Sequence, residues 1–186
     1  MPNVNPPAVD GRIHTYAQTP LAASTTRCHA AVTDNGAAQT VTTSITNPDV
    51  PRNVTATAGG TAGDIKAISV IITGTNYEDV VITETLPAFT VDTAGTKTGS
   101  KCFKTITSIY IPAHDGTGAT TAVGFGSKLG LNDRLSRNTV MAAYLNNAKE
   151  GTAPTVTVDA SALESNGFTL NSALDGTAVA VDYYKA

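Results

Sequence analysis

The sequence contains no tryptophan, few other aromatic residues, two cysteines and three histidines. Cys28 and Cys102 are too few for a zinc site, so we expect two buried or unreactive thiols. No two histidines have the i, i+2 or i, i+4 spacing that directs two imidazole rings at one metal ion. The scarcity of aromatic side chains also weakens the case for a carbohydrate-binding platform. The sequence therefore assigns no metal-binding residue and predicts no cofactor.

Charged residues are also few, at 15% of the chain, and the formal net charge is −3. The lysines and arginines are scattered, whereas a nucleic-acid surface needs them in clusters to displace phosphate counterions. No apolar window approaches the ~18 residues of a membrane span, and the N-terminus lacks the features of a signal peptide. We therefore expect synthesis in the cytoplasm and neither a nucleic acid nor a membrane as partner.

The motifs of common enzyme families are missing. There is no G-x-S-x-G nucleophile elbow, no Walker phosphate loop and no G-x-G-x-x-G sequence. His114 and Asp115 lie in a glycine-rich turn, where an aspartate commonly bonds its own backbone. We interpret Glu78, Asp79 and Glu84 as solvated charges that keep a sheet edge from pairing. The sequence therefore predicts a protein that is not an enzyme and assigns no catalytic residue.

Threonine is the residue in excess, at 31 of 186 positions. Its β-branched side chain favours extended backbone and half-buried sheet surfaces. Turn residues recur about every ten positions, which is typical of many short antiparallel strands. The length suits one domain with a core of its own. We therefore predict an all-β fold: a single antiparallel β-sandwich, jelly-roll-like or barrel-like, over residues 21–186.

The strand pattern is clearest between Arg52 and Leu131. Residues 64–74 form the longest β-branched run, which predicts a core strand buried on both faces. A turn over residues 74–77 leads to residues 78–86, where alternate side chains point to opposite faces. The other predicted features are strands at residues 41–45, 102–111, 119–125, 138–147, 155–160, 168–170 and 178–184, hairpin turns at residues 114–118 and 175–176, and loops at residues 59–63 and 93–100. For residues 138–147 the spacing also fits a short helix, and the surrounding strands favour a strand.

Residues 1–20 contain four prolines and only isolated apolar residues. This composition favours extended backbone and cannot build its own core, so we expect an extended N-terminal arm. In one interpretation the arm is a frayed terminus. In the other, Val9, Ile13 and Tyr16 lie in a groove on a neighbouring subunit and become ordered on assembly.

Residues 52–60, 71–87 and 103–131, with the sequence PAHDGTG at residues 112–118, resemble small structural proteins of tailed bacteriophages and prophages, of the head-decoration or accessory virion type. The resemblance covers about residues 21–135. It implies a virion protein that binds the major capsid protein, or another virion protein, in many copies and stabilises the head. It also implies a homo-oligomer such as a trimer. The alternatives are a tail or neck component and a host-surface glycan-binding module.

Overall fold

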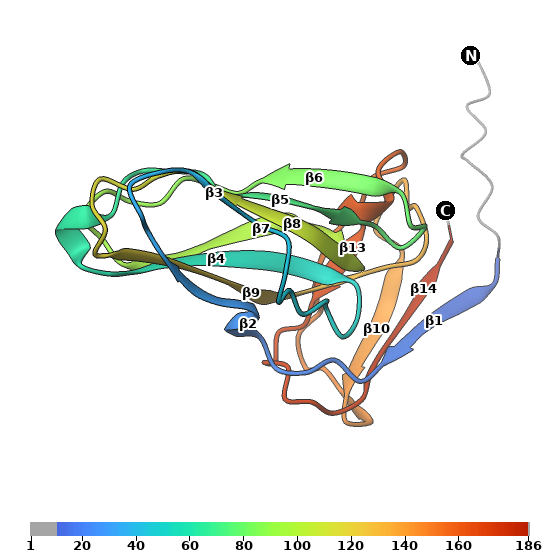
Figure 1. Ribbon diagram of the computed structural model, residues 1–186. Coiled ribbons are helices and arrows are strands. Elements are labelled where there is room, and N and C mark those ends of the chain that lie inside the picture. The colour runs from blue at the N-terminus through green and yellow to red at the C-terminus, as the bar shows by residue number, and fades with distance from the viewer. Residues whose placement is uncertain (1–10, 186) are drawn as a thin grey trace, which may run out of the picture.

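The computed structural model describes residues 11–185 and shows an all-β chain whose paired strands are antiparallel (Figure 1). In the central sheet, β9 (Ala119–Gly130) pairs with β4 (Arg52–Gly60) on one side. On its other side β9 pairs first with β2 (Ser24–Thr33) and then with β13 (Gly167–Thr169). The sheet is completed by β7 (Gly95–Phe103) beside β4 and β12 (Thr155–Thr157) beside β13.

A second sheet, here called the outer sheet, shares the first hydrophobic core with the central sheet. Its strand order is β3 (Gln39–Val41), β8 (Thr105–Ile111), β5 (Ile71–Thr75) and β6 (Val81–Thr85). Alternate residues of these strands are buried, because one face of the sheet meets the core. The first core joins residues of both sheets, among them Val54, Ile72, Ile82, Phe103, Ile109, Val123 and Phe125.

A third sheet, here called the terminal sheet, brings the two ends of the described chain together. Its order is β1 (Ile13–Gln18), β14 (Val179–Tyr184), β10 (Val140–Leu145) and β11 (Ala148–Lys149). It contributes to a second core, which also contains Leu129 of β9 and Phe168 of β13. Thus β9 contributes to both cores, the first through Phe125 and the second through Leu129.

The predicted core strand over residues 64–74, expected to be buried on both faces, is wrong in its first half, and in its second half only alternate residues of β5 are buried. A short 3-10 turn, η1 (Ala62–Asp64), precedes irregular backbone, and β5 begins only at Ile71. Ile65 and Ile68 are nevertheless buried, and their carbonyl oxygens accept hydrogen bonds from the backbone of Asp92 and Phe89. These bonds satisfy the backbone without a regular ladder, so the apolar run packs into the core as an irregular segment.

Two predicted hairpins are wrong, because each turn carries the chain into a different sheet. The segment around residues 114–118 leads from β8 in the outer sheet to β9 in the central sheet. The segment containing Asp175 and Gly176 leads from β13 in the central sheet to β14 in the terminal sheet. The predicted loop over residues 93–100 is also wrong, since β7 begins at Gly95. The hairpin after residue 74 is confirmed as the pairing of β5 with β6.

Part of the predicted N-terminal arm belongs to the terminal sheet. Ile13–Gln18 form β1, which pairs with β14 from Ile13 opposite Tyr184 to Gln18 opposite Val179. The segment is therefore extended, as predicted, and it pairs along one side with a strand of its own chain. Residues 1–10 lie outside the described residues. The other predicted strands include one at residues 138–147, which is confirmed as β10.

Candidate functional site

The exposed face of the outer sheet carries hydroxyl and methyl groups and no charge. Its four strands contain a single charged residue, Glu84, which is turned inward and buried. The exposed face is here called the threonine face. Its side chains come from paired positions of neighbouring strands. They are Thr40, Ile71, Thr73, Thr75, Val81, Thr83, Thr85, Thr105, Ser108 and Tyr110.

Cross-strand hydrogen bonds fix the threonines of this face. The hydroxyl oxygens of Thr75 and Thr105 are 2.7 Å apart, and those of Thr73 and Thr83 are 3.3 Å apart. Val81 is 71% exposed at the edge of the sheet, and Tyr110 is also exposed. The threonine face is therefore an uncharged surface with cross-strand hydrogen bonds, and the apolar side chain of Val81 lies at its β6 edge.

Two β-bulges lie on the two sides of β4, opposite neighbouring residues of that strand, and both have the sequence Gly-Ser-Lys. In β9, residues 126–128 stand opposite Asn53 alone, because Arg52 pairs with Leu129 and Val54 with Phe125. In β7, residues 99–101 stand opposite Val54 alone. Bulges bend a strand and leave some of its backbone groups without a ladder partner. The two bulges therefore interrupt the central sheet at the same level.

The side chain of Asn53 bonds to both bulges. Its Nδ2 donates to the carbonyl oxygen of Gly99 at 2.9 Å, and its Oδ1 accepts from the backbone N–H of Lys128 at 3.0 Å. A side chain at position 126 would overlap Oδ1 of Asn53, so Gly126 is needed for this close approach. Asn53 is buried, and its amide takes the place of the missing ladder bonds.

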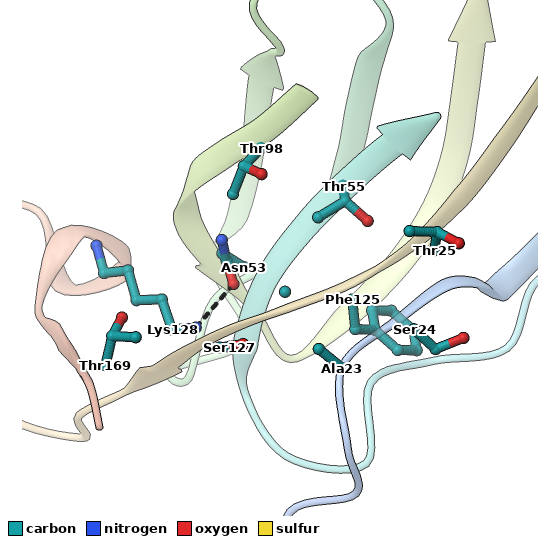
Figure 2. Close-up of a pocket in the computed structure, with 11 residues that line it drawn as sticks. Ala23, Ser24, Thr25, Asn53, Thr55, Thr98, Phe125, Ser127, Lys128 and Thr169 are labelled. Atoms are coloured by element: carbon teal, nitrogen blue, oxygen red, sulfur yellow. Dashed lines mark hydrogen bonds between the residues drawn. The ribbon is translucent and has the colours of Figure 1, made fainter. Parts of the chain in front are cut away.

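Beside Asn53 lies an open groove of about 590 Å³, shown in Figure 2. Ser24 and Thr25 lie at one end of the view, and Lys128 and Thr169 lie at the other. The groove lies where β2 and β13 leave β9 unpaired, since β2 reaches only Phe125 and β13 begins at Leu129. Its lining is hydroxyl-rich and contains no carboxylate: Ala23, Ser24, Thr25, Asn53, Thr55, Thr98, Phe125, Gly126, Ser127, Lys128 and Thr169.

One hydroxyl in this groove lacks a hydrogen-bond partner. Thr55 is 5% exposed, and its Oγ1 is buried without a partner among the described residues. A hydroxyl buried without a hydrogen bond costs free energy in the folded state. The next outward threonine of β4, Thr57, instead bonds Thr96 at 2.8 Å. The groove thus holds an unused donor and acceptor at its base.

The one cation in the groove, Lys128, is already held by backbone carbonyls. Its Nζ donates to the carbonyl oxygens of Ser100 at 2.6 Å and Ser165 at 3.1 Å. Lys128 therefore connects the β7 bulge to the segment that contains η2 (Leu163–Ser165). Because two N–H donors of the ammonium are used in this way, the groove offers neutral hydrogen-bonding groups more than free charge.

Arg52 is fully buried and supports the β9 bulge from the opposite side. Its guanidinium donates from Nε to the carbonyl oxygen of Gly126 at 2.9 Å and from Nη1 to that of Leu21 at 2.8 Å. Asp49 Oδ1 lies 3.1 Å from Nη1 and neutralises the charge. A buried arginine needs such partners. Arg52 is structural, and it connects β4, β9 and the segment before β2.

The expectation that Glu84 is a solvated charge is wrong. Glu84 is buried, and its Oε1 accepts hydrogen bonds from the backbone N–H groups of Ser100 at 2.6 Å and Lys101 at 3.2 Å. It also accepts from the hydroxyl of Ser100 at 3.0 Å. The alternation along β6 placed Glu84 on the inward face, where it meets the β7 bulge. Glu78 and Asp79, by contrast, form exposed pairs with Arg134 and Lys104.

The three residues predicted to contact a neighbouring subunit have different surroundings. Val9 lies outside the described residues. Ile13 is 58% exposed on the edge strand β1. Tyr16 is buried in the second core of its own chain, with its ring edge-on to Phe168 at 5.1 Å between centroids. Burial, with the charges of neighbours such as Tyr77, raises the pKa of Tyr16 well above its usual value.

His114 has a structural position in the connection between β8 and β9. Its Nδ1 accepts the backbone N–H of Lys66 at 3.2 Å, and its Nε2 is 2.9 Å from the hydroxyl of Thr121. Burial lowers the pKa of His114, although the nearby carboxylates of Asp34 and Asp115 oppose this shift. The imidazole is therefore neutral at pH 7 and bonds two segments together.

A polar cluster around Asp133 connects the terminal sheet to the segment before β10. Asp133 accepts from the hydroxyl of Tyr183 at 2.8 Å and pairs with Lys185 at 2.8 Å and with His14 at 3.6 Å. Burial alone would raise the pKa of Asp133, but the hydrogen bonds from Lys185 and Tyr183 hold it below its usual value. The carboxylate is thus held as an anion, and it connects β1, through His14, to the end of β14, through Tyr183 and Lys185.

The remaining reactive side chains form no further site among residues 11–185. Cys28 and Cys102 are both free and buried, as the sequence predicted. No group of three or more His, Cys, Asp and Glu side chains within this range is placed to hold a metal ion. No helix in the same range has the length and apolarity needed to span a membrane.

Comparison of the chain with models of protein families, with curated proteins and with solved structures finds no match in any of the three. The threonine face and the groove beside Asn53 are therefore interpreted from their own chemistry. Neither was located by the sequence analysis, although the repeated Gly-Ser-Lys tripeptide at residues 99–101 and 126–128 was a visible signal for the two bulges.

Proposed function

We propose that this protein is a virion structural protein of a tailed bacteriophage or prophage, which binds the head in many copies and stabilises it. The observation that carries the proposal is the threonine face, whose strands hold one charged residue, turned inward, in a chain with 15% charged residues. The resemblance of residues 21–135 to head-decoration and accessory virion proteins supports the same assignment. The major capsid protein is the proposed partner.

The chemistry of the threonine face suits docking onto another protein. No ion has to be desolvated when this face is covered, so the main electrostatic cost of association is absent. Threonine loses little side-chain entropy on binding, because its branched Cβ already restricts χ1. The methyl groups, Val81 and Tyr110 supply apolar area, and the hydroxyls supply hydrogen bonds.

Attachment in many copies makes weak single contacts effective. Each copy that bridges two capsid subunits gains from the high effective concentration of the second contact. We propose that the subunits are β-sandwiches that associate as a homo-oligomer, such as a trimer, and that the exposed Ile13 near the N-terminal segment contributes to subunit contacts. Mass measurement in solution tests the oligomeric state.

The test is binding to shells assembled by co-expressing the major capsid protein encoded by the same genome. We expect the purified wild-type protein to sediment with these shells and to raise their thermal stability. Thr83→Lys places a charge on the threonine face and should abolish co-sedimentation. The control is Thr152→Lys, an exposed threonine between β11 and β12 that belongs neither to the threonine face nor to the groove lining, and this variant should bind as the wild type does.

Cryo-electron microscopy of intact particles then places the protein. Density on the head surface supports a decoration role, whereas density only at the neck or tail replaces it with the alternative structural role. Failure of the wild-type protein to bind any part of the particle would overturn the proposal. Equal binding by the Thr83→Lys variant would show that another face makes the contact.

A further inference from the structure

We propose that the groove beside Asn53 binds an extended, uncharged peptide segment of the shell protein, as a second contact distinct from the threonine face. This inference rests on the proposed function for the identity of the partner. Its evidence is independent of the threonine face, because the groove belongs to the central sheet and the threonine face to the outer sheet.

The first argument is the state of the β9 backbone. Residues 126–128 pair with neither β2 nor β13 on one side, and with no residue of β4 on the other. Arg52 occupies the carbonyl oxygen of Gly126, and Asn53 occupies the N–H of Lys128. The backbone of Ser127 between them is left without a ladder partner. An extended peptide supplies alternating N–H and C=O groups of the kind that such a backbone lacks.

The second argument is the hydroxyl of Thr55. It is buried, it lines the groove, and it has no hydrogen-bond partner among the described residues. Asn53 also retains capacity, since only one of its two Nδ2 protons has a partner in the described structure. A ligand that places a carbonyl or N–H group over β4 would satisfy both residues.

The third argument concerns the class of ligand. The lining has no carboxylate for a basic ligand, and its single lysine is held by the carbonyl oxygens of Ser100 and Ser165. Its one aromatic side chain, Phe125, is only 1% exposed, so the groove offers no ring on which a sugar would stack. The hydroxyls and threonine methyls match a peptide with small, uncharged side chains. The groove lies between the ends of two strands, β2 and β13, which suits an extended segment.

The experiment compares two isosteric changes on the same face of β4. Thr55→Val removes the unpartnered hydroxyl, and Thr57→Val removes a hydroxyl that is satisfied by Thr96 outside the groove. Half-saturating concentrations for the co-expressed capsid shells are measured for both variants, together with Tm. We expect Thr55→Val to weaken binding by about three- to tenfold, the loss of one hydrogen bond, while its Tm stays the same or rises. Thr57→Val should bind as the wild type does.

A steric variant and a direct probe complete the test. Thr98→Tyr should fill the groove and weaken binding more than Thr55→Val does. Hydrogen exchange at the Ser127 N–H should slow when shells are added. If both Thr55→Val and Thr98→Tyr bind shells as tightly as the wild type, the groove is not a binding site and the proposed function stands. The same conclusion follows if shells do not slow hydrogen exchange at Ser127. If the wild-type protein does not bind shells at all, the proposed function fails and this inference fails with it.

Discussion

The Oδ1 atom of Asn53 accepts the backbone N–H of Lys128 at 3.0 Å, and this bond connects β4 to the bulged segment of β9. The Nδ2 atom of the same amide donates to Gly99 in the β7 bulge. One buried side chain therefore substitutes for ladder bonds on both sides of β4. Both bulges are therefore held by this one residue, which also lines the groove.

We predict that Asn53→Ala lowers the free energy of unfolding by about 2–4 kcal/mol, because it leaves two buried backbone groups without partners. Urea denaturation monitored by circular dichroism measures the change. Asn35→Ala is the control, since Asn35 lies in an exposed turn and accepts only the N–H of Ala37. Equal midpoints for the two variants would contradict the role given to Asn53.

We predict that Glu84→Gln destabilises the protein by about 1–3 kcal/mol, because charge-assisted bonds to the β7 bulge are replaced by weaker neutral ones. Glu78→Gln provides the matched control: Glu78 is exposed and pairs with Arg134, so its loss should leave the unfolding midpoint nearly unchanged. A larger effect at Glu78 than at Glu84 would show that the buried carboxylate is not what holds the bulge.

The stability of the protein should decrease on mild acidification because of His114. Burial lowers the pKa of this imidazole in the folded state, so folding favours the neutral form. The contribution is complete above the unfolded-state pKa of about 6.5 and is lost as pH falls through the lower folded-state pKa. Tm measured at pH 7.5 and at pH 5.5 should fall more for the wild type than for His114→Gln. Parallel falls would refute the assignment.

The two cysteines should not react in the native protein. Burial raises the pKa of both Cys28 and Cys102 to about 12, so neither forms the nucleophilic thiolate near neutral pH. A thiol reagent such as Ellman's reagent should label no cysteine in native protein at pH 8 and both cysteines in denaturant. Rapid labelling of the folded protein would show that at least one thiol is accessible.

Local sequence patterns predicted the class of fold and several strands. The alternation around Ile82 correctly assigned the inward and outward faces of β6. In a half-buried strand every second side chain points to the core, so the sequence alternates between apolar and polar residues. The turns after Ile111 and Leu170 were assigned as hairpins, since turn residues specify that the chain reverses. They do not specify which sheet receives the next strand, which depends on contacts far apart in the sequence.

The candidate sites were less predictable than the strands. The threonine face requires the order β3-β8-β5-β6, and three of these strands are separated by long segments. The groove requires the register of β9 against both β4 and β13, so that Asn53 meets residues 126–128. Glu84 was misread because an acidic residue on a strand is usually solvated, and only the β7 bulge supplies the N–H groups that hold it inside.

The pairing of β1 with β14 has a consequence for biosynthesis. Thr15 bonds Asp182 across 167 positions of sequence, so the strand that emerges early from the ribosome cannot find its partner until much later. Tyr16 and the other apolar side chains of the second core therefore stay exposed to solvent until β14 has been synthesised. At high expression levels, incomplete chains with this surface exposed would be prone to aggregate, and chaperones or rapid release of the finished chain from the ribosome would counteract this.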